Sequence, residues 1–189
     1  MHPRNTLVST KGMKKIGLLS DTHGYMDDRI ISYLSDCDEI WHAGDVGSEK
    51  IIDTLAALKP LRAVYGNIDG ARMRRMLPEI LQFELENAKV LITHIAGYPG
   101  HYNRNAMDAI RAYQPNIVVC GHSHILKVMY DKALNHMHLN PGAAGIHGFH
   151  TVRTMLRFSI DQGKIINAEV VELGKRSSRL GNLTPGLPK

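Results

Sequence analysis

The chain has 189 residues, of which 43% are hydrophobic and 22% charged, and these proportions suit one globular domain with a sizeable core. Its formal net charge of +5 is concentrated near the two ends, so we interpret it as solvated ends rather than a nucleic-acid surface. The only cysteines are Cys37 and Cys120, which excludes a small disulfide scaffold and favours a cytoplasmic setting. No apolar run approaches the roughly 18 residues of a membrane span, so we expect no membrane partner.

Three segments are expected along the chain. Residues 1–12 lack the apolar segment of a signal peptide, and we predict a disordered extension there. Met13 directly precedes the first strand pattern, and residues 13–173 are predicted to form a single domain. Residues 174–189 are rich in Gly, Ser, Pro and basic residues, which predicts a disordered basic tail.

The first third of the chain alternates short apolar runs with amphipathic segments. Apolar runs followed by polar loops predict buried strands, and apolar residues at helical spacing predict helices between them. The expected order is strand Lys14–Ser20, helix Asp27–Ser35, strand Glu39–His42, helix Ser48–Lys59 and strand Leu61–Tyr65. Strands joined by helices lie parallel, so this part predicts an α/β fold.

The remainder of the chain is richer in strands. A hairpin is expected over 80–93, a helix over Asn103–Tyr113 and an apolar strand over Asn116–Cys120. Four further strands with short turns between neighbours favour an antiparallel second half: Leu126–Tyr130, Asn135–Leu139, Thr151–Ile160 and Lys164–Leu173. The complete pattern predicts two mixed β-sheets packed as a sandwich and flanked by helices.

Potential metal ligands follow five of the predicted strands. The chain holds 11 histidines, an unusual number, and several of them fall in these loops. The candidates are Asp21, His23, Asp45, Asn67, His94, His122 and His124. Strand ends are where the functional groups of an α/β sheet gather, so the seven side chains can converge. In Asp-x-His and His-x-His, an extended chain would place alternate residues on one side.

The kinds of donor atom indicate which cations would bind. Carboxylate, imidazole and amide groups without thiolate favour Mn, Fe, Ni, Co or Zn, and of these we favour Mn. Seven donors are too many for one tetrahedral zinc, but they suit two divalent ions that share a carboxylate. Two such ions, two aspartates and one hydroxide would leave one positive charge, which attracts a phosphate oxyanion.

The order of these motifs resembles a known family. Asp21-x-His23, Gly44-Asp45, Gly66-Asn67-x-Asp69, His94 and Gly121-His122-Ser123-His124 are similar to the calcineurin-like metallophosphoesterases. Within them, the chain looks like the small bacterial and archaeal phosphodiesterases, including their Asn140-Pro141-Gly142 turn. The resemblance covers about residues 14–173 and implies the same four-layer α/β/β/α fold.

The resemblance also implies a role for each candidate ligand. Asp21, His23 and His124 would hold one metal, Asn67, His94 and His122 would hold the other, and Asp45 would bridge them. A metal-bridging hydroxide would attack phosphorus and hydrolyse a small phosphate ester, most simply a phosphodiester.

The chain departs from the family pattern at two places. Ile68 stands where many members have a histidine that protonates the leaving group, which puts a side-chain acid in doubt. The usual His-Gly-His is replaced by a longer loop that runs from His94 to His101. We therefore take Asp45, His94 and His101 as the candidate catalytic residues.

Several other polar residues have simpler interpretations. His42 is expected to be a core histidine or to orient a ligand, and Asp69 to cap a turn or helix. His136 and His138 predict a half-exposed strand face. A surface loop is expected at His147 and His150, although either could contact substrate, and a solvated helix face is favoured over a phosphate clamp at Arg72, Arg74 and Arg75.

Two alternative functions remain open from sequence alone. One is a nuclease or cyclic-nucleotide phosphodiesterase of the same superfamily, although aromatic residues are only 6% and no aromatic DNA platform is evident. The other is a non-catalytic protein-binding scaffold, because a retromer subunit shares this fold with degraded metal ligands. The intact ligand set argues against the scaffold. Nucleic-acid binding and a homo-oligomer are left open as partners.

Overall fold

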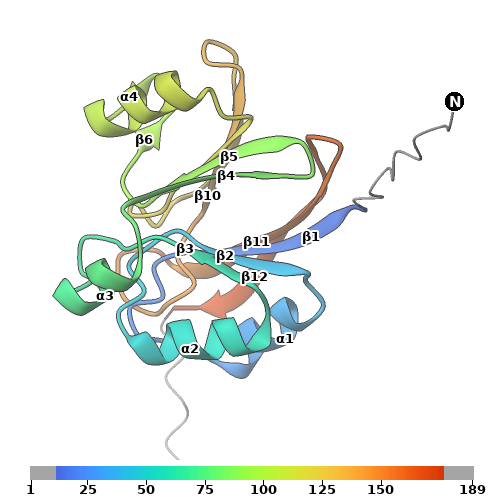
Figure 1. Ribbon diagram of the computed structural model, residues 1–189. Coiled ribbons are helices and arrows are strands. Elements are labelled where there is room, and N and C mark those ends of the chain that lie inside the picture. Colours follow the sequence, from blue (N-terminus) through green and yellow to red (C-terminus); the bar gives the residue numbers. More distant parts are fainter. Residues whose placement is uncertain (1–11, 177–189) are drawn as a thin grey trace, which may run out of the picture.

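Two five-stranded sheets pack face to face in the computed structural model, which describes residues 12–176 (Figure 1). Helices α1 (Asp28–Ser35) and α2 (Glu49–Leu58) cover the outer face of one sheet. Helix α4 (Arg104–Tyr113) covers the outer face of the other sheet. The predicted α/β sandwich of two mixed sheets flanked by helices is therefore confirmed.

The first sheet combines the parallel strands of the first third with two strands from the end of the domain. Its order is β12 (Lys164–Lys175), β11 (Val152–Asp161), β1 (Lys14–Leu19), β2 (Glu39–His42) and β3 (Leu61–Ala63). Strands β1, β2 and β3 are parallel, as predicted from the intervening helices. Strand β11 pairs antiparallel with both β1 and β12.

The second sheet is also mixed. Its order is β4 (Ile80–Leu85), β5 (Ala88–Thr93), β8 (Ile117–Val119), β10 (His136–Pro141) and β9 (Leu126–Asp131). The predicted antiparallel pairs β4–β5 and β9–β10 are present, but β8 lies parallel to both β5 and β10. The antiparallel pairing expected of the four strands after residue 125 is present in β9–β10 and β11–β12, whereas the sequence predicted no partner for β8, because short turns report only the pairing of strands adjacent in sequence.

Three short elements are present in addition to the predicted strands and helices. Helix α3 (Ala71–Met76) follows the loop after β3, and β6 (Gly97–Tyr98) pairs with β7 (His101–Tyr102) in a short hairpin. Helices α1 and α4 begin at side-chain caps: Asp27 accepts from the Ile30 amide and Asn103 from the Ala106 amide. Ser48 precedes α2 as predicted, but its side chain makes no capping hydrogen bond.

Aromatic packing joins the two sheets. Trp41 of β2 is fully buried and lies edge-on to Phe83 of β4 and Phe158 of β11, with ring centroids 5.3 Å and 5.6 Å away. Its indole nitrogen donates to the Glu39 carboxylate at 2.8 Å, which satisfies the buried donor. This cluster fixes the relative position of the sheets whose strand ends carry the candidate ligands.

Other sequence-based expectations meet the structure at the edges. Strand β12 continues to Lys175, two residues beyond the expected end of the domain. The rest of the predicted tail and nearly all of the predicted extension lie outside the described residues, and the domain boundaries stay predictions. Cys37 and Cys120 are free and buried. Within residues 12–176, no helix has the length and apolarity that crossing a bilayer requires.

The aromatic cluster yields a stability prediction. Trp41→Ala removes the largest buried side chain between the sheets and is expected to cost about 3–5 kcal/mol of unfolding free energy. Urea denaturation followed by circular dichroism measures this loss. Phe149→Ala, at a fully exposed ring, is the matched control and should change stability by less than about 0.5 kcal/mol. Equal stability of both variants would contradict the role given to Trp41.

Candidate metal centre

All seven predicted ligands lie in loops that follow the ends of parallel strands. The loops after β1, β2 and β3 of one sheet and after β5 and β8 of the other supply them. Because the carboxyl ends of these strands point the same way, side chains distant in sequence meet at one edge of the sandwich. The role of each residue as a metal ligand remains a prediction.

A first group consists of Asp21, His23 and His124, whose ligand atoms lie within 4.8 Å of one another. The Asp21 Oδ1 atom is 3.1 Å from His124 Nε2 and 3.9 Å from His23 Nε2. The two imidazole nitrogens are 3.3 Å apart. This is the set that the family resemblance assigns to the first cation.

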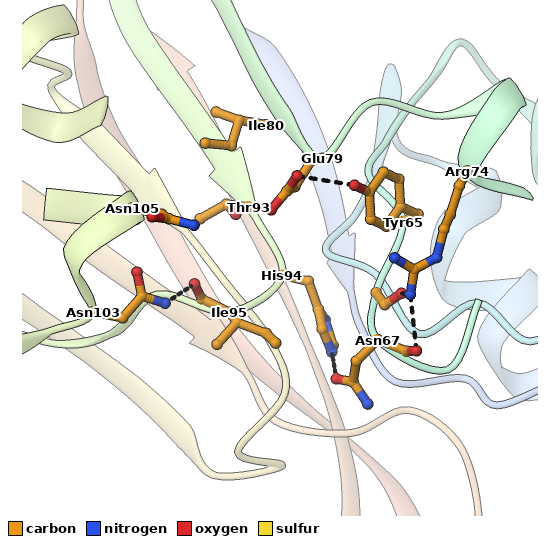
Figure 2. A pocket seen from close by; sticks show the side chains of 11 residues that line it. Tyr65, Asn67, Arg74, Glu79, Ile80, Thr93, His94, Ile95, Asn103 and Asn105 are labelled. Carbon is orange, nitrogen blue, oxygen red and sulfur yellow. Dashed lines mark hydrogen bonds between the residues drawn. The ribbon is translucent and has the colours of Figure 1, made fainter. Parts of the chain in front are cut away.

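A second group surrounds the ring of His94. Its Nε2 atom is 3.2 Å from Asp45 Oδ1, 3.1 Å from Asn67 Oδ1 and 4.0 Å from Asp21 Oδ1. The His122 ring lies edge-on to His94, with centroids 5.3 Å apart. Figure 2 shows the contact between His94 and Asn67 at one end of a pocket.

The two groups are joined through both carboxylates. Asp45 turns Oδ1 toward His94 and Oδ2 toward His23, which is 3.7 Å away. That arrangement suits the bridging position predicted for Asp45. Asp21 also reaches both groups, although the resemblance placed it with only one of them.

The position of the hydrogen on His94 indicates that a cation fits between its ring and the carboxylates of Asp21 and Asp45. His94 Nδ1 lies 2.7 Å from the Ala43 carbonyl, which can only accept, so this nitrogen carries the hydrogen. A neutral His94 ring then presents a lone pair to the Asp45 carboxylate. Asp21 Oδ1 is buried and accepts no hydrogen bond from any described residue. Acceptors facing acceptors are costly unless a positive charge lies between them.

A proton competes for the same position. Burial lowers the pKa of His94, but its hydrogen bond to Asp45 and the charges of Asp21 and Asp45 outweigh burial and leave that pKa raised. Burial raises the pKa of Asp45, but hydrogen bonds from His94 and the Ile68 amide outweigh it and leave that pKa lowered. The charge of the two carboxylates therefore holds a cation here, whether a proton or a metal ion.

The backbone of the centre is strained. Five of the seven candidates have positive φ: Asp21 (54°), His23 (48°), Asp45 (53°), His122 (67°) and His124 (56°). The expectation that Asp-x-His and His-x-His are extended was therefore wrong, because the first and last residues of both motifs have left-handed backbone conformations. Each such residue costs of order 1–3 kcal/mol and persists only where surrounding contacts hold it, a pattern typical of functional sites.

Backbone contacts between the loops hold this strained conformation. The amides of Asp21 and His23 donate to the carbonyls of Gly44 and Asp45, each at 3.0 Å. Two glycines allow close approach: a Cβ on Gly66 would collide with Asp45, and one on Gly121 would collide with Ser20. The loops therefore form one interlocked unit.

The side chains of Asp69 and His42 stabilise these interlocked loops through hydrogen bonds. The Asp69 carboxylate accepts from the amides of Val46, Gly47 and Gly66 at 2.8–3.1 Å, so it caps turns as predicted and joins two ligand loops. His42 is buried between them, its Nδ1 accepting from the Gly44 amide and its Nε2 lying 2.9 Å from the Thr22 hydroxyl. Burial lowers the pKa of His42 to about 4, and the ring is neutral.

Two histidines outside the predicted ligand set approach the centre. His150 Nε2 lies 3.1 Å from the Gly145 carbonyl, so its Nδ1 accepts and can orient His124 Nδ1 at 3.3 Å. The ring of His147 lies 6.0 Å from that of His23. The expected surface loop is present, because residues 147–149 are exposed, and both histidines also lie beside candidate ligands. Sequence offered no signal for this, because the contacts join segments that are not adjacent in the chain: His150 and His124 are 26 positions apart, and His147 lies more than 100 positions from His23.

His136 and His138 do not form a half-exposed face, as the alternating pattern had suggested. Both are buried beside Tyr102, whose hydroxyl lies 2.8 Å from His136 Nε2 and 3.3 Å from His138 Nδ1. Burial lowers the pKa of His138 to about 4. The expectation was wrong because the β6–β7 hairpin and α4, which cover this face of the sheet, are not adjacent to β10 in the sequence.

Arg74 holds the loop that carries Asn67. Its Nε donates to the Asp69 carbonyl at 2.7 Å, and its Nη2 donates to the carbonyl of Asn67 at 3.0 Å (Figure 2). The guanidinium also lies over the Tyr65 ring. Arg72, Arg74 and Arg75 are all exposed, as expected of a solvated helix face, but Arg74 also binds the backbone of the preceding loop.

The candidate acid His101 lies elsewhere. It belongs to the exposed β6–β7 hairpin, and its ring packs 4.9 Å from that of Tyr98. Among the described residues, none of its recorded contacts is with a candidate ligand. Ile68 contributes its amide to Asp45 Oδ1 at 3.0 Å and leaves its side chain exposed.

Comparison with known proteins agrees with the fold and the motifs. The profile of the calcineurin-like phosphoesterase superfamily domain matches residues 13–163. A probable metallophosphoesterase of Mycoplasma pneumoniae is 30% identical over 160 residues, covering 81% of this chain and 94% of that protein. Another from Methanothermobacter thermautotrophicus is 27% identical over 166 residues, covering 84% and 92%.

A solved structure shares the fold. Vps29 of Entamoeba histolytica, determined in complex with Zn²⁺, has a TM-score of 0.62 and 17% identity, covering 84% of this chain and 98% of that one. The matched domain spans most of the chain, and the chain belongs to the calcineurin-like phosphoesterase superfamily.

The contacts of Arg74 predict an effect on cation binding. Arg74→Ala frees the loop that carries Asn67 and should weaken binding at the His94 group about 10–100-fold. Arg74→Lys should recover little, because a single ammonium cannot replace the planar fork. Titration calorimetry with Mn²⁺ measures the affinity.

Arg75→Ala is the matched control for this experiment, because Arg75 is exposed on the same helix. The control should bind Mn²⁺ as the unmodified protein does. Unchanged affinity in Arg74→Ala would show that the loop holds its position without the guanidinium.

Proposed function

We propose that the protein is a phosphodiesterase that binds two divalent cations and hydrolyses small phosphate esters. The observation that carries this proposal is the pair of ligand groups joined by Asp45, whose two oxygens face histidines of different groups. A shared carboxylate is the usual link between paired ions about 3.5–4 Å apart. Membership of a phosphoesterase superfamily supports the reaction class.

The ligand chemistry favours transition metals. Asp21, His23 and His124 would hold one ion, and Asn67, His94 and His122 the other. Oxygen and imidazole ligands suit Mn, which we favour, and also Fe, Ni, Co and Zn. The Zn²⁺ complex of Vps29, a protein of the same fold, supports zinc as one alternative.

When bound, the two cations neutralise phosphate charge and make water nucleophilic near neutral pH. The residues of this chain hold and orient them. His94 keeps its hydrogen on Nδ1 through the Ala43 carbonyl, and His150 does the same for His124, so both rings turn Nε2 inward. The interlocked loops keep these groups in place, so little reorganisation is needed as charge develops on phosphorus.

His147 is the better placed candidate to protonate the leaving group. It is exposed and its ring lies beside that of His23, whereas His101 packs against Tyr98 on the hairpin. We propose that His147 supplies the acid that Ile68 cannot.

The alternative functions have less support. A scaffold would not require strained backbone at five ligand positions, nor a buried Asp21 oxygen to which no residue of 12–176 donates. A nuclease would need a longer basic and aromatic surface than the chain offers. We therefore expect the substrate to be a small phosphate ester and the protein to act in the cytoplasm.

The bridging role predicts the effect of one conservative change. Asp45→Asn keeps a residue type that tolerates the φ of 53° but removes the charge between the two groups. Turnover should become undetectable with mono-, di- and cyclic phosphate esters in Mn²⁺, and calorimetry should show the loss of bound metal. Asp53→Asn, exposed on α2, should keep full activity. Full activity in Asp45→Asn would place the chemistry elsewhere.

The proposed acid predicts a dependence on the leaving group. His147→Ala should slow the release of basic alkyl leaving groups about a hundredfold, with little change for nitrophenyl, which needs no protonation. Steady-state kinetics across a series of esters measures the slope. His101→Ala should leave the slope unchanged, and the opposite pattern would assign the acid to the hairpin.

A further inference from the structure

A pocket of about 270 Å³ opens beside the metal centre. Figure 2 shows His94 and Asn67 at one end, Tyr65 and Arg74 on one side, and Asn103 on the other. Its walls come from the loop after β3, from α3, from β4 and β5 of the second sheet and from the start of α4. Because two candidate metal ligands line it, an ester whose phosphorus lies at the centre can direct one of its organic groups into this space.

The pocket contains hydrogen-bonding groups that lack partners. Thr93 is 5% exposed, yet its hydroxyl makes no hydrogen bond within the described residues. The Asn105 amide, on the first turn of α4, likewise has none there. Glu79 uses one carboxylate oxygen to accept from the Tyr65 hydroxyl at 2.9 Å, and the other is without a partner in residues 12–176. Asn105 and Glu79 are exposed to water and Thr93 is buried, and all three can form hydrogen bonds with a ligand that enters the pocket.

The charges around the pocket restrict that ligand. The Arg74 guanidinium is held by backbone carbonyls, and the Glu79 carboxylate lies across from it on the pocket wall. The pocket therefore carries one positive and one negative side chain, and this balance gives no net preference for a second phosphate or a carboxylate on the substrate. Hydroxyl groups, in contrast, can donate to Glu79 and exchange hydrogen bonds with Thr93 and Asn105.

We propose that this pocket binds a neutral, hydroxyl-bearing organic group of the phosphodiester, about the size of one sugar ring. The volume lies just below the usual range of about 300–1,000 Å³ for small-molecule sites, so it admits one ring and not an oligonucleotide. Ile80 and Ile95 supply apolar walls for the carbon face of such a ring. The claim that this group is part of a phosphodiester rests on the proposed phosphodiesterase function. The claim that the pocket binds a hydroxyl-bearing ring does not.

Two nitrophenyl phosphodiesters that differ only in their second ester group test the proposal by kinetics. One carries an ethyl group and the other a ribosyl group, and both are assayed with the Mn²⁺-loaded protein. Asn105→Trp places a large ring at the pocket wall from an exposed helix position. It should lower kcat/KM for the ribosyl ester about tenfold or more and change the ethyl ester less than about twofold. Arg111→Trp, exposed further along α4, should affect neither ester.

A binding measurement separates this proposal from the proposed function. Methyl riboside, titrated into the metal-free protein and followed by amide NMR, should shift the signals of Thr93 and Asn105, and Asn105→Trp should abolish those shifts. Shifts without any turnover would refute the phosphodiesterase function and leave the pocket assignment standing. Absence of shifts at millimolar riboside, or equal losses for both esters in Asn105→Trp, would overturn the assignment.

Discussion

The structure depends on two buried carboxylates that face nitrogen and oxygen acceptors. Asp21 and Asp45 lie within 4 Å of histidine nitrogens, and His94 has already committed its one hydrogen to a backbone carbonyl. In a buried site this arrangement is repulsive until a positive charge enters it. The loops can therefore be understood as a frame that brings like-charged and electron-rich atoms together and keeps them there.

The frame is built from backbone hydrogen bonds and charged caps rather than from the ligands. Asp69 collects three amides from two loops, and Arg74 collects carbonyls from the loop that carries Asn67. His42 joins the loop of Asp21 to that of Asp45 while remaining neutral. These contacts offset the free energy of holding ligand residues in left-handed conformations. The protein therefore adopts this geometry before any cation binds.

Local patterns were enough to predict the layers and the ligand types. Apolar runs with helices between them predicted the parallel order of β1, β2 and β3, because a strand–helix–strand unit has one strongly preferred arrangement. The same patterns predicted the strand β8 but not its partners, which lie far from it in sequence. Strand ends followed by Asp, His and Asn predicted the candidate ligands, because the ends of parallel strands share one edge.

The sequence by itself determined which donor atoms exist, that they follow strands, and therefore that an oxygen and nitrogen cation site was expected. Only the tertiary structure decided which oxygen of Asp45 faces which histidine, that the ligand turns are left-handed, and that His150 and Arg74 act from outside the motifs. Residue type and spacing record local chemistry and periodicity. Proton placement and orientation depend on contacts between segments that packing alone brings together.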